Sequence, residues 1–141
     1  MGAFAGLALI IAVILWLMSL YYLNRDSQLT IRNNSIHDFT DVIVGIPESS
    51  LNPSYFNGKI PAGSVLSFQY HPSVEGSLVI SGKLSGGTIQ CNGPYETLGY
   101  FQPYVDSEVL IDAKGHVRIT SIVGDIPRSR RYTYDCWPGE S

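Results

Sequence analysis

The sequence predicts an all-β fold, a sandwich of about seven to eight antiparallel strands preceded by one N-terminal transmembrane α-helix. Three observations support this fold class: the chain is almost entirely apolar up to Leu23, apolar and polar residues then alternate over short runs, and turn residues separate these runs. With 141 residues in all, the chain has room for one domain after the apolar segment. The predicted divisions are an anchor helix at 1–24, a sandwich at 25–127 and a C-terminal strand or tail at 128–141.

The N-terminal apolar segment has the length of a membrane span. From Ala3 to Leu23 it contains no charged residue, and a helix rising about 1.5 Å per residue would extend roughly 31 Å there, matching the hydrocarbon core. Trp16, Tyr21 and Tyr22 lie toward its C-terminal end, where aromatic rings favour the headgroup region. A cleaved signal peptide needs a basic start, a shorter apolar run and small residues before the cut, all of which are missing. We therefore expect an uncleaved single-pass anchor whose partner is the lipid bilayer.

Small residues inside this segment suggest a second role. Gly2 and Gly6 form a G-x-x-x-G pattern, and Ala8 with Ala12 continues the same spacing on a neighbouring stripe. Such stripes let two helices approach closely, although the pattern also arises by chance in lipid-facing helices. Contact with another membrane protein or self-association through the helix is the alternative to a purely lipid-facing surface.

The orientation of the chain is open to two interpretations. Arg25 and Arg32 follow the apolar segment, which taken alone favours a cytoplasmic domain. Asp26 interrupts this positive bias, and the rest of the chain has the composition of an exported domain, with few lysines and many Tyr, Asn, Ser and Gly residues. We expect an extracytoplasmic domain, periplasmic or at the cell surface, and a cytoplasmic orientation stays open.

Short runs of alternating residues predict the strands of the first half. Leu29–Arg32 and Val42–Ile46 alternate, and a loop rich in Ser, Asn and Pro follows them. The turn at Pro61–Gly63 then precedes Val65–Tyr70, the clearest strand pattern in the chain.

Further runs with turns between them predict the strands of the second half. The segment Asn92–Ser107 contains prolines and several aromatic residues, which favours a long ordered connection over a strand. Gly86-Gly87 predicts a tight hairpin turn, and Asp112–Gly115 predicts a second hairpin loop. The predicted strands are Leu78–Leu84, Thr88–Cys91, Val109–Ile111, Val117–Val123 and a last run at Tyr132–Cys136.

Two stretches of this pattern carry a resemblance to a known class of domains. Gln28–Ile46, with Leu-Thr-Ile-Arg-Asn-Asn-Ser followed by Asp-Val-Ile-Val, resembles the first strands of immunoglobulin-like modules in bacterial exported, membrane-anchored proteins. The turn at Ile60–Gly63 before an alternating strand is similar too. The resemblance implies an immunoglobulin-like antiparallel β-sandwich and carries over no site.

Cys91 and Cys136 are the two cysteines of the chain. A disulfide between them would close a loop of about 45 residues and, in the chain-entropy model, stabilise the domain by roughly 4 kcal/mol. Two separate thiols are the alternative, and the pairing depends on a domain outside the cytoplasm.

The sequence contains no set of residues that indicates catalysis, a cofactor or a metal site. The three histidines, His37, His71 and His116, fall in predicted turns without a nucleophile motif around them. No Gly-rich phosphate loop is present, so no small-molecule substrate is identified. Nine Lys and Arg residues and a net charge of −3 argue against a nucleic-acid partner.

Aromatic and basic residues provide two candidate contact surfaces. Tyr95, Tyr100, Phe101 and Tyr104 form a candidate contact patch in the predicted connection, with packing over the open end of the sandwich as the alternative. Near the C-terminus, three arginines precede Tyr132 and Tyr134, namely Arg128, Arg130 and Arg131. They suggest either a solvated strand end or a contact with lipid headgroups or an acidic partner.

These observations favour a non-enzymatic accessory or interaction subunit of a membrane or envelope complex. Two alternatives stay open. A pilin-like fibre subunit would bury its N-terminal helix in a filament core, but the chain lacks the expected Gly-Phe processing site with a following Glu. A membrane-face enzyme of unknown reaction would need catalytic residues that the sequence does not reveal.

Overall fold

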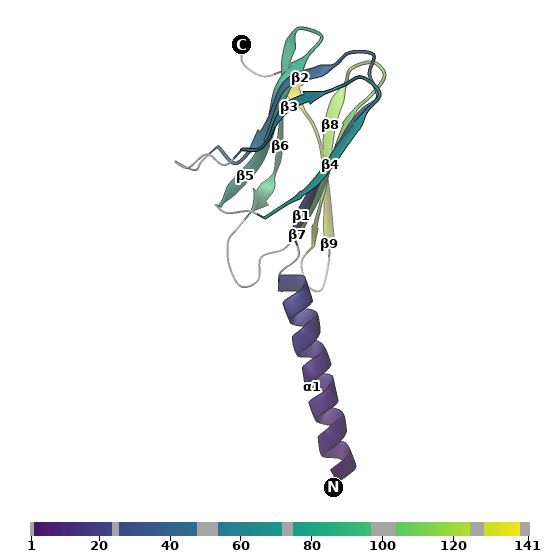
Figure 1. Cartoon of the computed structure of the whole chain (residues 1–141), viewed down its shortest axis with the longest axis vertical. Helices are drawn as coiled ribbons and strands as arrows, with labels where there is room; N and C mark the ends of the chain where they lie inside the picture. Colours follow the sequence, from purple (N-terminus) through teal and green to yellow (C-terminus); the bar gives the residue numbers. More distant parts are fainter. Residues whose placement is uncertain are drawn as a thin grey trace.

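The computed structural model describes residues 2–23, 26–47, 54–71, 75–96, 104–124 and 129–138 (Figure 1). In these ranges one helix precedes ten strands, so the predicted β-sandwich is confirmed, with more strands than expected, and the N-terminal segment is helical. The elements are α1 (Gly2–Leu23), β1 (Ser27–Asn33), β2 (Phe39–Gly45), β3 (Ser54–Ile60), β4 (Val65–Tyr70), β5 (Gly76–Leu84), β6 (Gly87–Glu96), β7 (Tyr104–Ile111), β8 (Val117–Gly124), β9 (Ser129–Asp135) and β10 (Trp137–Pro138).

The strands form two five-stranded sheets, in the orders β4-β1-β7-β8-β9 and β10-β6-β5-β2-β3. Figure 1 shows the sheets facing each other, with α1 extending from one end of the sandwich. Neighbouring strands are antiparallel except β1 and β7, which run parallel. The sequence predicted antiparallel pairing throughout. This pair differs because the chain passes through the other sheet between β1 and β7, which supplies the crossover that parallel strands need.

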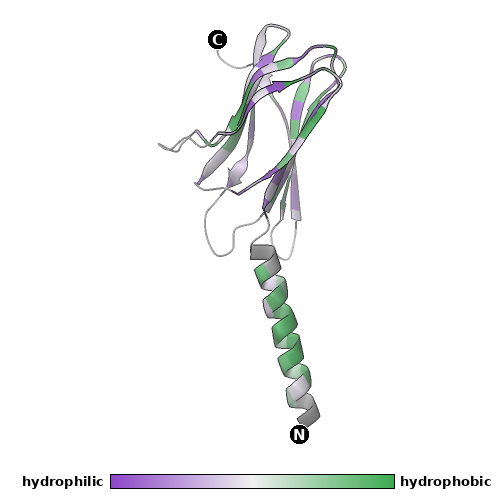
Figure 2. Cartoon of the chain, viewed as in Figure 1, coloured by the Kyte–Doolittle hydropathy of each residue, from purple (hydrophilic) through white to green (hydrophobic). Residues whose placement is uncertain are grey.

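The facing sides of the two sheets share one apolar core. In β1, buried residues alternate with residues that are half-buried or exposed, as the sequence pattern predicts. Apolar residues accordingly recur along the strands in Figure 2. Fully buried core side chains include Leu29, Ile31, Phe39, Val42, Val44, Ile46, Ile60, Leu78, Ile80, Val109, Ile111 and Ile119.

Two strands were not predicted from the sequence. Strand β3 has no alternation of apolar residues and contains Asn57-Gly58, yet it pairs along one side of β2. Strand β10 has two residues and pairs with Gln90 and Ile89 of β6. Both strands depend on a partner far along the chain, which a local residue pattern does not record.

The predicted connection at Asn92–Ser107 is wrong at both of its ends. Strand β6 continues to Glu96, and β7 already begins at Tyr104, which leaves residues 97–103 outside the described part. Pro94 is compatible with β6 because it falls between Asn92 and Tyr95, where the pairing with β5 is irregular, and lies beyond the short ladder with β10.

The hairpin between β5 and β6 turns one residue earlier than predicted. Leu84 pairs with Gly87, so Ser85 and Gly86 occupy the centre of the turn. Both central residues have positive φ, 51° and 84° respectively, as a two-residue hairpin turn of this kind requires.

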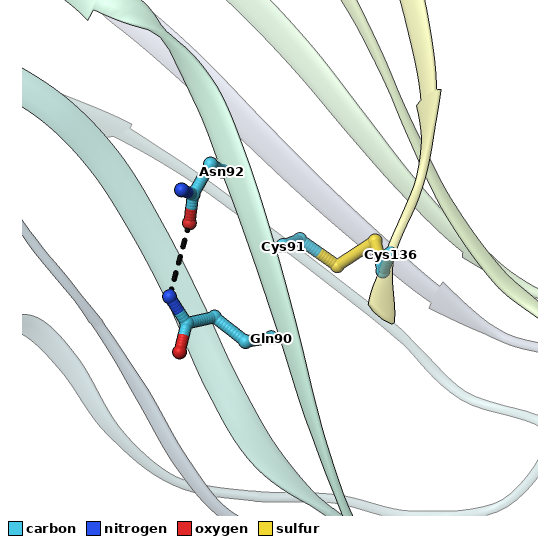
Figure 3. The surroundings of a disulfide bond; sticks show 4 residues. All are labelled: Gln90, Cys91, Asn92 and Cys136. Carbon is cyan, nitrogen blue, oxygen red and sulfur yellow. Dashed lines mark hydrogen bonds between the residues drawn. A yellow bond between two sulfur atoms is a disulfide. The ribbon is translucent and has the colours of Figure 1, made fainter. Parts of the chain in front are cut away.

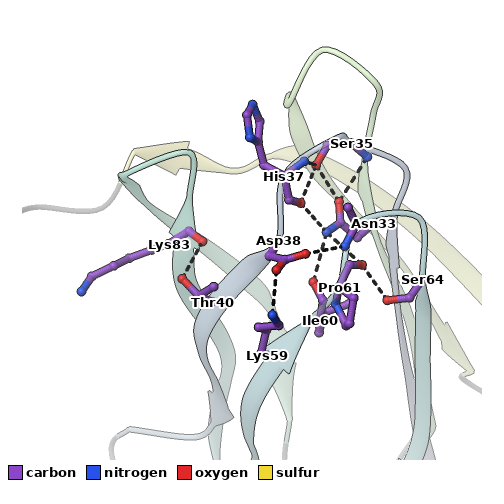
Figure 4. A network of polar contacts seen from close by, with 11 residues as sticks. Asn33, Ser35, His37, Asp38, Thr40, Lys59, Ile60, Pro61, Ser64 and Lys83 are labelled. Atoms are coloured by element: carbon purple, nitrogen blue, oxygen red, sulfur yellow. Dashed lines mark hydrogen bonds and ion pairs between the residues drawn. The ribbon is translucent and has the colours of Figure 1, made fainter.

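A buried asparagine joins the end of β1 to the turn between β3 and β4 (Figure 4). The Asn33 amide donates to the carbonyl oxygens of His37, Ile60 and Pro61 at 2.9, 3.2 and 3.3 Å. Its Oδ1 accepts from the backbone N–H and the hydroxyl of Ser35, at 3.2 and 2.7 Å. Asn33 is fully buried, and both its side-chain NH2 group and its Oδ1 make hydrogen bonds. We therefore interpret this cluster as a structural corner, meaning a set of bonds that holds the end of β1 against the turn between β3 and β4.

The C-terminal segment crosses from one sheet to the other and is held there by a disulfide. Cys136 lies between β9 and β10, and its backbone N–H donates to Val117 O at 2.8 Å. Its sulfur is bonded to that of Cys91 in β6, with Cα atoms 4.6 Å apart (Figure 3). The predicted pairing of the two cysteines is confirmed.

Candidate functional site

The described side chains of α1 expose apolar surface on all sides of the helix. From Ala5 to Leu20 every residue is exposed except Ser19, which is half-buried. Six consecutive residues, Val13–Met18, are each 46–61% exposed. Since consecutive helical residues point in different directions, no side of this stretch is covered by the sandwich. Figure 2 shows the apolar colour continuing around the helix.

Among the residues whose side chains the structure describes, no helical run is long and apolar enough to cross a membrane. Ala8 and Ala12 are exposed, and nothing lies within 4 Å of the position that a Cβ would take at Gly6. Gly2 begins α1, but its surroundings lie outside the described residues. Association through these small residues stays a prediction.

Backbone pairing sets which residues lie at the end of the sandwich next to α1. Tyr104 pairs with Gly124, and Gly124 pairs with Ser129. The start of β7, the end of β8 and the start of β9 therefore lie side by side. Ser27 begins β1 four positions after Leu23, the last residue of α1. We call this the basal end, defined by Ser27, Tyr104, Gly124 and Ser129. The opposite end, which contains Asn33, is the distal end (Figure 1).

The two described aromatic residues of the predicted contact patch both lie at the basal end. Tyr95 is the penultimate residue of β6 and is 57% exposed. Tyr104 is half-buried against Gly124, where a Cβ would lie only 2.1 Å from the tyrosine ring. Tyr100 and Phe101 lie outside the described residues. The structure thus places the described part of the patch at the end of the sandwich from which α1 extends.

Two of the three C-terminal arginines are also basal. Arg130 pairs with Val123, and Arg131 pairs with Ile122, at the start of β9. Both arginines are exposed, and neither makes an ion pair with any residue in the described ranges. Arg128 lies outside those ranges. Tyr132 and Tyr134 follow on the same strand, with nearly parallel rings whose centroids are 6.3 Å apart.

The basal end also contains a buried acid that the sequence did not single out. Glu96, the last residue of β6, is only 3% exposed, and its Oε1 accepts a hydrogen bond from the Tyr70 hydroxyl at 2.5 Å. Its Oε2 is buried and has no hydrogen-bond partner among the described residues. The buried hydroxyl of Tyr55 also lacks one, and the Tyr55 and Tyr70 rings are 4.8 Å apart.

Burial changes the protonation of this cluster. Removal from water raises the pKa of Glu96 to about 7, although the hydrogen bond from Tyr70 acts in the opposite direction. Burial, and then the nearby Glu96 carboxylate, raise the pKa of Tyr70, so its hydroxyl stays protonated as a donor. Near neutral pH, Glu96 is therefore divided between its protonated and ionised forms.

The distal end contains a cleft beside the disulfide. It has a volume of about 520 Å³, and its lining includes Leu110, Asp112, His116, Arg118, Asp135 and Cys136. Asp112 Oδ1 accepts from the backbone N–H groups of His116 and Lys114, and these contacts lower the pKa of Asp112. His116 Nδ1 is 3.2 Å from Asp112 Oδ2. These bonds close the predicted Asp112–Gly115 hairpin, so the pair has a structural role.

The other two histidines and the remaining acids do not assemble a metal site in the described part of the chain. His71 Nδ1 is 3.2 Å from Asp26 Oδ1, and the backbone of His37 belongs to the Asn33 corner. Within the described ranges, no group of three or more His, Cys, Asp or Glu residues is placed to hold a metal ion.

Sequence reasoning found the basal tyrosines but missed Glu96 and Tyr70. Tyr70 ends a well-predicted strand, and Glu96 stands alone in a Tyr-rich segment. The sequence offered one signal for Tyr70. This residue occupies the last inward-facing position of the Val65–Tyr70 run, so its hydroxyl lies at the edge of the core. Comparisons with protein-family models, with curated proteins and with solved structures found no match to this chain.

Proposed function

We propose that this protein is a single-span, membrane-anchored β-sandwich that acts as a non-enzymatic interaction subunit. One observation carries the proposal: α1 exposes apolar side chains on every side, whereas the sandwich closes its own core without it. The helix requires an apolar environment that the rest of the described chain does not supply. A lipid bilayer supplies it over the whole helix.

The exposed apolar surface of α1 is large. Eleven large apolar side chains of α1 are between 39% and 70% exposed, from Leu7 to Leu20. Fully burying such a side chain gains about 1.5–3 kcal/mol, and about half of each is still exposed, so the set gains roughly 10–15 kcal/mol on transfer to lipid. The full helix, Gly2–Leu23, has 22 residues and a length of about 33 Å, close to a hydrocarbon core of about 30 Å.

The disulfide supports an extracytoplasmic position for the sandwich, periplasmic or at the cell surface. Such bonds form and persist mainly in oxidising compartments. The bond between Cys91 and Cys136 joins the C-terminal segment to β6, so it contributes to the fold itself. We therefore favour an oxidising compartment over the cytoplasmic side that the small positive bias after the helix would indicate.

The sandwich provides surfaces for protein contact. Strand β9 is an edge strand whose residues are exposed except for half-buried Tyr132, and its free backbone groups can pair with an extended segment of a partner. The open space around Gly6, with Ala8 and Ala12 exposed, suits a second helix in the membrane. The partner class we favour is another membrane protein or a second copy of this chain.

The anchor is tested by fractionating cells that express the tagged full chain. We expect the protein in the membrane pellet, resistant to alkaline carbonate and released by mild detergent. Ile11→Arg with Leu15→Arg should move it out of this fraction, since each central arginine opposes insertion by about 2.5–3.5 kcal/mol. Ile36→Arg is the matched control, because Ile36 is 81% exposed on the sandwich.

Two further outcomes decide between the alternatives. Protease is added to intact cells and to cells whose outer layer is permeabilised while the inner membrane stays closed. We expect the protease to digest the sandwich in one of these preparations. A sandwich that is digested only after the inner membrane is opened would contradict the orientation. A wild-type chain that is soluble and monomeric without detergent would overturn the anchor. Recovery in sheared filaments would favour the pilin-like alternative instead.

A further inference from the structure

We propose that Arg130 and Arg131 bind the headgroups of anionic phospholipids, so that the basal end of the sandwich rests on the membrane that holds α1. The inference rests on the proposed membrane anchor and adds a second, lipid-specific contact to it. The two arginines come from the far end of the chain. Only the folded sheet brings them beside the helix.

Strand register shows where Arg130 and Arg131 lie along the strand direction relative to the end of α1. Gln28 of β1 is opposite Asp106 of β7, Asp106 is opposite Ile122 of β8, and Ile122 is opposite Arg131. Arg131 therefore lies level with Gln28, and Arg130 lies one residue nearer the helix. Figure 1 shows the start of β9 next to the end of α1.

The distance to the lipid is short enough for contact. Leu23 and Ser27 are four positions apart, so the chain between them covers at most about 14 Å. The headgroup region extends about 5–8 Å beyond the hydrocarbon core. Long arginine side chains can extend toward it while their stems stay on the protein surface. The neighbouring positions Arg130 and Arg131 leave opposite faces of β9, so they can reach separate headgroups.

The charges at the basal end leave these two cations available. Asp26 is paired with His71 at 3.2 Å, and both Asp106 and Glu75 have partners of their own. Arg130 and Arg131 are exposed and make no ion pair within the described ranges.

Aromatic residues at the same end fit the same environment. Tyr104 lies on the level nearest the helix, and Tyr95 is exposed near the end of β6. Tyrosine rings favour the boundary between hydrocarbon and headgroups, where one side is apolar and the other wet. An anionic lipid surface accounts for both the arginines and the tyrosines, whereas an acidic protein segment accounts for the arginines alone.

The test uses the full chain in nanodiscs of phosphatidylcholine, with or without phosphatidylglycerol, and measures backbone hydrogen exchange in residues 129–135. We expect slower exchange in the anionic discs. Each arginine near an anionic surface favours the docked state about fivefold, so Arg130→Gln with Arg131→Gln should reduce that population about 30-fold. Raising the salt concentration should have a similar effect on the wild-type chain.

Lys114→Gln is the matched control, since Lys114 is an exposed cation of the distal hairpin. It should leave exchange in residues 129–135 unchanged, and all variants should melt at the wild-type temperature. Equal exchange in the two lipid compositions, or an unaltered double variant, would overturn the headgroup contact while leaving the anchor standing. Failure of the chain to enter nanodiscs at all would overturn the anchor and the contact together.

Discussion

The two ends of the sandwich bury polar side chains in contrasting ways. At the distal end, the Asn33 side chain makes hydrogen bonds through both its nitrogen and its oxygen, so its capacity is used. At the basal end, Glu96 is nearly as enclosed, but only one carboxylate oxygen has a partner among the described residues. Tyr55, packed against Tyr70, likewise buries a hydroxyl without such a partner.

The buried polar groups of the distal end therefore stabilise the fold, whereas the buried acid of the basal end does not serve stability alone. A buried polar group with all its bonds made stabilises one arrangement of the chain, whereas an incompletely bonded acid opposes burial once it ionises. The acid belongs to the basal end, the end that we propose faces the membrane. Three substitutions test the comparison, from the largest expected effect to the smallest.

Asn33→Ala should destabilise the distal end most. The substitution leaves the buried groups of Ser35 and several backbone carbonyls without their partner, at about 1–3 kcal/mol for each group. We expect the free energy of unfolding to fall by about 4 kcal/mol, measured by chemical denaturation in mild detergent. Asn34→Ala is the control, because that side chain is exposed and should change the free energy by less than about 0.5 kcal/mol. Equal effects would contradict the structural corner.

Glu96→Gln should remove a pH dependence that belongs to the basal end. The pKa of Glu96 is about 7 in the folded chain and near 4.5 when unfolded, so between these values the folded state holds a proton that the unfolded state has released. The free energy of unfolding therefore falls as the pH rises through this window, by about 3 kcal/mol in all. The stability that Glu96 itself contributes is fully present below the window and is lost above about pH 7.

The measurement compares denaturation midpoints at about pH 5 and about pH 8. The glutamine variant should lose most of the difference and be more stable than the wild type at the higher pH. Glu108→Gln is the control, because Glu108 is exposed and paired with Arg32 at the surface. A wild-type pH profile in the Glu96 variant would show that another group is responsible.

Gly82→Ala should destabilise the packing near the distal end. A Cβ there would lie 2.6 Å from the Phe39 ring and 3.0 Å from Thr40 O, and Phe39 is fully buried. Because the ring has no space to retreat, we expect a loss of about 2 kcal/mol in thermal or chemical denaturation. Gly87→Ala is the control, since its Cβ would meet only Leu84 O at 3.6 Å. A neutral Gly82 variant would show that this end is loosely packed.

Much of the fold was predictable because strands with one buried face leave a period of two in the sequence. The runs at Leu29–Arg32, Val65–Tyr70 and Val117–Val123 all became strands. Strand β3 was missed because its residues are only partly covered, so they carry no clear alternation. The Asn92–Ser107 interval was misread because prolines and tyrosines resemble a loop when the neighbouring strand is unknown.

The candidate site was predicted less completely. The sequence indicated Tyr95, Tyr104, Arg130 and Arg131 as separate groups, without showing that all four belong to one end of the sandwich. Beyond the inward position of Tyr70, no sequence pattern indicated its contact with Glu96, since the two residues lie on different sheets. Their contact arises from packing between elements, which residue spacing does not encode.

By itself, the sequence determined an apolar helix followed by β-strands that bury one face, because hydrophobic periodicity depends only on nearby residues. The tertiary structure decided which strands are neighbours, that Cys91 meets Cys136, and that Arg131 lies level with Gln28 beside α1. These relations join residues far apart in the chain. They follow from the order and register of the strands, which are selected by the packing of the whole domain rather than by any local run of residues.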